Sequence, residues 1–119
     1  ATSNICTNQA WVALRTAIHV AALGAEGMVD LAEDQVRYAR DAAAELDEIA
    51  GVEAPADDCH HLREFPVRVA TDATRVRDDL IDRGYAVHAI DDDLLQVCVT
   101  EQTAEYVDGL VAALAEVVA

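Results

Sequence analysis

The opening ten residues carry the side chains of this chain that are best suited to binding a small anion. They read ATSNICTNQA and contain two threonines, one serine, two asparagines and one glutamine directly before a predicted helix. Backbone N–H groups at a helix N-terminus are free to bind phosphate or carboxylate oxygens, and short hydroxyl and amide side chains can add hydrogen bonds. The segment predicts either the edge of a polar pocket or an N-terminal cap, and physical reasoning alone favours the cap.

Two further clusters contain metal-binding residue types without the spacing that a metal needs. The run Cys59-His60-His61 places neighbouring side chains in one loop, where they cannot easily face one ion, and no second cluster has zinc-like spacing. The triple aspartate Asp91-Asp92-Asp93 lacks the spaced ligands and the glycine of a calcium loop. We therefore predict a polar loop at the first run, a solvated turn at the second, and no bound metal.

Arg15 and His19 are the polar pair on an otherwise apolar predicted helix. They are four residues apart and therefore share a face. Buried polar side chains need partners, which here could be a carboxylate within the domain or an adjoining domain across an interface. We predict that both are core or interface residues rather than direct ligand contacts.

The chain contains no lysine, because all eight basic residues are arginines. A Schiff base with a carbonyl substrate or with pyridoxal phosphate requires a lysine amine, which other polypeptide would have to supply. The sequence also has no glycine-rich phosphate loop and no nucleophile elbow. We predict no catalytic residue within these 119 positions.

Composition excludes several classes of partner. There are 23 acidic and 8 basic residues, giving a net charge of −15, which excludes nucleic-acid binding and opposes binding to anionic membranes. No run of 18 strongly apolar residues and no basic leader occurs, so neither a transmembrane helix nor a signal peptide is expected. Three widely spaced cysteines, Cys6, Cys59 and Cys98, favour reduced thiols in a cytoplasmic protein. The aspartate-rich, lysine-free surface suggests a halophilic origin, because molar salt screens closely spaced carboxylates.

The elements that must position these residues form one α+β domain, residues 1–119, with helices on one face of a small, mostly antiparallel sheet. A helix from Asn8 to Leu23, apolar on nearly every side, should be buried and should end at Gly24. The remaining predicted elements are a helix over 25–50, a short extended stretch at Val52, a strand over 64–70, a helix over 72–84, a hairpin of 85–90 with 94–99, and a helix over 103–118. Met28 and Ile81 are expected to face inward from their helices, and Pro66, which lacks a ladder donor, is expected at the beginning or along an edge of its strand. The alanine at position 1 and the polar opening suggest a fragment of a longer chain.

Four stretches of sequence carry a resemblance to a known family. The string Ala1-Thr2-Ser3-Asn4-Ile5-Cys6-Thr7-Asn8-Gln9-Ala10 resembles the signature that opens the C-terminal region of subunit 1 in the P-protein family of the glycine cleavage system. Supporting stretches are Ile49-Ala50-Gly51-Val52, Glu64-Phe65-Pro66-Val67-Arg68-Val69 and Val99-Thr100-Glu101. The loop at 59–61 and the turn at 90–93 depart from the family's pattern.

The resemblance implies the small C-terminal domain of an aspartate-aminotransferase-like, fold type I enzyme that uses pyridoxal phosphate. It implies glycine decarboxylation, with transfer of the aminomethyl group to the lipoylated H-protein and with the cofactor's lysine on subunit 2. If any side chains of this chain reach an active site, we expect Ser3, Asn4, Thr7 and Asn8, because short hydroxyl and amide groups beside a helix N-terminus can hydrogen-bond a carboxylate or phosphate. The alternative is that these residues cap the helix and fasten the domain to its neighbour. The alternative from another class is a free-standing, non-catalytic α+β binding or interaction module. In either case the isolated chain is expected to hold no cofactor.

Overall fold

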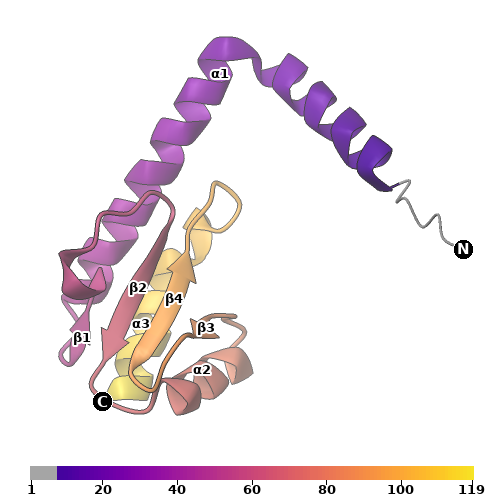
Figure 1. Ribbon diagram of the computed structural model, residues 1–119. Helices are drawn as coiled ribbons and strands as arrows, with labels where there is room; N and C mark the ends of the chain where they lie inside the picture. Colours follow the sequence, from indigo (N-terminus) through magenta and orange to yellow (C-terminus); the bar gives the residue numbers. More distant parts are fainter. Residues whose placement is uncertain (1–7) are drawn as a thin grey trace, which may run out of the picture. The chain divides into compact units, whose positions relative to one another are not determined.

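The computed structural model describes residues 8–119, which fall into two units, residues up to Glu33 and residues 34–119 (Figure 1). The first unit contains only part of one helix, α1, which runs from Asn8 to Asp47 and is interrupted at Gly24. Gly24 has φ 67° and ψ −175°, a conformation that glycine adopts without steric cost. The predicted break between two helical stretches is therefore confirmed.

The first stretch of α1 is exposed, contrary to the prediction that it is buried. Every residue from Gln9 to Ala22 is exposed, including Trp11 and Ile18, each 61% accessible. The same holds for Met28, which was predicted to face inward. The physical reason is that residues 8–33 contain no second element that could cover the helix.

By length and composition, the segment from Gln9 to Asp47 is long and apolar enough to cross a membrane, contrary to the prediction that the chain has no such helix. The core helices of soluble proteins satisfy the same criterion. The break at Gly24 also leaves the apolar stretch before it shorter than the ~20 residues that a bilayer core requires, and Arg15 lies near its middle.

The second unit contains a four-stranded antiparallel sheet in the order β1-β2-β4-β3. Its elements are β1 (Val52–Glu53), η1 (Ala56–Asp58), β2 (Glu64–Val69), α2 (Ala73–Asp82), β3 (His88–Ala89), β4 (Leu94–Cys98), η2 (Ala104–Tyr106) and α3 (Val107–Val118). The predicted strands and the hairpin are confirmed, as is the α+β class.

One face of the sheet packs against helices and the other is open (Figure 1). Alternate residues of β2 and β4 are buried because strand side chains point to opposite faces. The core includes Phe65, Val67, Val69, Leu95 and Val97 from the sheet, Val99 just after β4, and Ala39, Ala43, Leu46, Val76, Leu80, Leu114 and Val117 from the helices.

Ile81 in α2 and Pro66 in β2 do not lie where the sequence predicted them. Ile81 was predicted to face inward but is 49% exposed, because it lies about 100° around the helix from the buried Leu80. Pro66 was predicted at an edge or at the beginning of a strand, yet β2 is an inner strand. Its pairing resolves the conflict, since β1 reaches only Arg68 and Val69 and leaves no ladder partner beside Pro66 on that side.

Candidate functional site

The four predicted cofactor-binding residues lie at the start of α1. Ser3, Asn4 and Thr7 fall outside the described residues, and Asn8 is the first residue of the helix, with only its backbone described. The helix begins where the sequence predicted its N-terminus. The roles of these four side chains remain a prediction.

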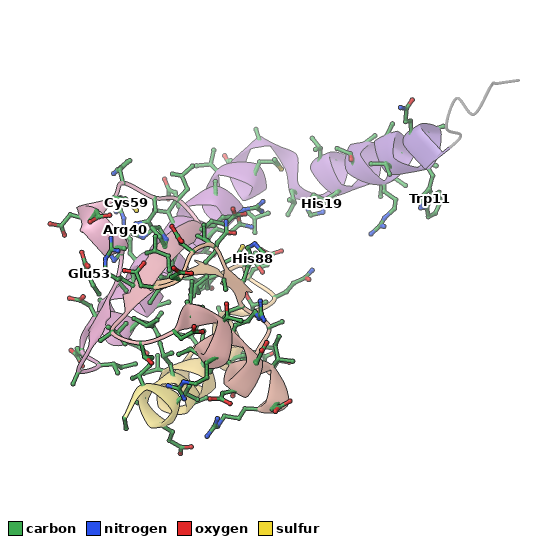
Figure 2. All side chains as sticks on the ribbon, turned by 60° about the horizontal axis from the view of Figure 1, so that its bottom comes forward. Trp11, His19, Arg40, Glu53, Cys59 and His88 are labelled. Carbon is green, nitrogen blue, oxygen red and sulfur yellow. The ribbon has the colours of Figure 1, made fainter. Side chains whose placement is uncertain are left out.

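Arg15 and His19 share one face of α1, as predicted. With Val12 and Thr16 they line a shallow hollow of about 290 Å³, and the Thr16 hydroxyl donates to the Val12 carbonyl at 2.9 Å. Figure 2 shows His19 and Trp11 projecting outward from this stretch. The Arg15 and His19 side chains are both exposed, so the prediction that they lie in a core is wrong. That they lie at an interface stays a prediction.

The Cys59-His60-His61 loop is held by packing. The His61 ring lies 5.1 Å from the Phe65 ring, centroid to centroid, and its Nδ1 atom is 3.3 Å from the Cys59 carbonyl oxygen. His60 is exposed. Among residues 8–119, no three histidine, cysteine or acidic side chains converge in a way that could hold a metal ion.

The open face of the sheet carries an ion-pair cluster that sequence reasoning missed. Arg68 donates from Nε to Glu53 at 3.1 Å, from Nη1 to Asp93 at 2.9 Å, and from Nη2 to Asp57 at 2.8 Å. The hydrogen bonds to Asp93 and then Glu53 raise the pKa of the Arg68 guanidinium, so it stays charged at any accessible pH. The predicted solvated turn at 91–93 is thus partly wrong, because Asp93 binds an arginine.

The cluster fixes structure and does not bind an anion. One arginine joins β1, η1, β2 and the turn before β4. Each of its three guanidinium nitrogens already contacts a carboxylate, so a phosphate would meet net negative charge there. The cluster could have been predicted only from the antiparallel pairing that sets Glu53 opposite Arg68, and composition does not reveal that pairing.

Cys98 lies on the same open face, beside Glu64. Its thiol donates to Glu64 Oε1 at 3.8 Å, and Gln96 Nε2 donates to Glu64 Oε2 at 3.2 Å. Burial and then the charge of Glu64 raise the pKa of the Cys98 thiol. A raised thiol pKa means less thiolate at neutral pH, so Cys98 is not an activated nucleophile.

We predict that Glu64→Gln increases the rate at which iodoacetamide alkylates Cys98 at pH 8. Removal of the carboxylate charge lowers the thiol pKa and raises the thiolate fraction at that pH. Peptide mass spectrometry would follow the rate, with Glu116→Gln as the control because that carboxylate pairs with Arg83 instead. An unchanged or slower rate in Glu64→Gln would contradict the stated cause of the shift.

A hollow in residues 34–119 lies beside β4 and α3. It measures about 330 Å³ and is lined mainly by apolar side chains, among them Val87, Val97, Tyr106 and Leu110. The Tyr85 hydroxyl lies against Gly109, and the tyrosine ring fits there because glycine has no side chain. The lining of the hollow has no carboxylate, histidine or arginine, and its titratable side chains are Tyr85, Cys98 and Tyr106, so it is suited to an apolar group.

The described residues therefore hold no assembled catalytic centre. Six of the eight arginines bind carboxylates: Arg37, Arg63, Arg68, Arg75, Arg77 and Arg83. Among the hydrogen bonds found in residues 8–119, the one histidine contact is to a backbone oxygen rather than to a hydroxyl or thiol.

Comparison with known proteins identifies the family. The sequence profile of the glycine cleavage system P-protein matches residues 1–114. The chain belongs to the glycine cleavage system P-protein family. A relative from Halobacterium salinarum, named probable glycine dehydrogenase (decarboxylating) subunit 1, is 57% identical over 118 residues, covering 98% of this chain and 27% of the relative. A relative of the same name from Aeropyrum pernix is 34% identical over 119 residues, covering 93% of this chain and 26% of its own.

A solved P-protein has the same fold. The chain matches a crystal structure of glycine decarboxylase, the P-protein of the glycine cleavage system in inhibitor-bound form, with a TM-score of 0.84 and 33% identity. The match covers 97% of this chain and 28% of that one. The chain thus spans about a quarter of the length of the P-protein relatives it matches.

Proposed function

We propose that this chain is the C-terminal part of subunit 1 of a glycine dehydrogenase (decarboxylating) and supports a reaction centred elsewhere in the assembled enzyme. The carrying observation is the match to glycine decarboxylase over 97% of the chain at a TM-score of 0.84. The described residues contain a well-packed core but no acid–base or nucleophilic centre, which is what a supporting domain requires. The alternative is a free-standing binding module, because the chain spans only about a quarter of the length of the relatives it matches.

We propose that residues 8–119 do not form a pyridoxal phosphate site by themselves. The 119 residues include no lysine to bind the cofactor covalently. Most of the arginines that could bind the cofactor's phosphate already pair with carboxylates, and Arg68 pairs with three carboxylates. We propose that subunit 2 supplies the lysine, that the bound cofactor's ring accepts the electrons released by decarboxylation, and that the lipoylated H-protein receives the aminomethyl group.

Borohydride labelling of the reconstituted enzyme tests this division of labour. The full-length gene product and subunit 2 would be combined with pyridoxal phosphate, assayed for glycine decarboxylation, reduced with borohydride and digested. The proposal expects turnover only when both subunits are present, with the reduced cofactor on a subunit 2 peptide. Label on a peptide of the subunit that contains this chain would contradict the assignment.

We predict that Asn4→Ala in the full-length subunit separates the two proposed roles of Ser3, Asn4, Thr7 and Asn8. An amide that binds a substrate carboxylate or cofactor phosphate contributes about 1–3 kcal/mol through its hydrogen bond. Glycine turnover should then fall while folding and assembly with subunit 2 are unchanged. Weakened assembly with normal turnover per assembled enzyme would instead assign the segment to capping and domain contacts.

We infer that the acidic surface is an adaptation to high salt. With a net charge of −15, mutual repulsion among surface carboxylates destabilises the folded chain, and molar salt reduces the Debye length to ~3 Å. The melting temperature should rise as KCl increases from about 0.1 M to roughly 3 M, because screening of the carboxylates becomes nearly complete over this range. A flat or falling curve would refute the adaptation.

We also propose a cytoplasmic location, because the cysteines are widely spaced and Cys59 and Cys98 are free thiols.

A further inference from the structure

We draw no further inference here: the strongest candidate, the apolar hollow of about 330 Å³ beside β4 and α3, carries nothing because no feature of residues 8–119 shows what group or partner covers it.

Discussion

Replacement of Leu80 by alanine should destabilise the chain by about 2–5 kcal/mol, whereas the same change at its neighbour Ile81 should cost less than about 1 kcal/mol. Leu80 is fully buried in the core formed by the sheet, α2 and α3. Its truncation removes apolar contacts and leaves a cavity. Ile81 is 49% exposed, so its truncation leaves no comparable cavity.

Urea unfolding of the two variants would measure this difference in the free energy of unfolding. The two residues are adjacent aliphatic side chains in α2, so helix propensity and position along the chain are closely matched. Equal losses, or a larger loss for Ile81→Ala, would contradict the orientation of α2 on the sheet. That orientation corrects the expectation from apolar spacing alone.

The 119-residue chain alone should bind no pyridoxal phosphate and decarboxylate no glycine, an all-or-none difference from the assembled enzyme. Covalent capture needs an amine that the chain lacks. Noncovalent capture of the phosphate is opposed by the net charge of −15 and by arginines already bound to carboxylates.

Absorbance titration of pyridoxal phosphate into the chain would measure this, with the reconstituted two-subunit enzyme as the positive control. The expected spectrum is that of free cofactor at every protein concentration. A saturable shift in the absorbance of the cofactor would show that the chain carries a complete site by itself. Such a result would place the centre of catalysis here rather than in the partner subunit.

Strands and turns were predictable because each has a local cause. Alternation in Phe65, Val67 and Val69 identifies β2 and its buried face, and Gly24 and Gly84 end helices with positive φ angles of 67° and 92°. The turn before β4 follows from the break between two alternating runs. These features depend on neighbouring residues alone.

Features set by distant parts of the chain were not predictable. The Arg68 cluster requires the register that places Glu53 opposite Arg68 and brings in Asp57 and Asp93 from two other segments. Apolar spacing predicts that the first stretch of α1 is buried, but residues 9–22 are exposed, because spacing along one helix does not show whether other elements cover it. For the same reason, the roles of the opening residues depend on what lies beside them in the assembled enzyme.

The intact mass of the natural gene product tests the central claim most directly. The account predicts a polypeptide several times heavier than 12.8 kDa, with the peptides of this chain inside it, because the Halobacterium relative is matched over only 27% of its length. Mass spectrometry of the protein purified from its own cells would give the value. A complete product of 12.8 kDa would contradict the assignment to a P-protein subunit and would favour the free-standing binding module.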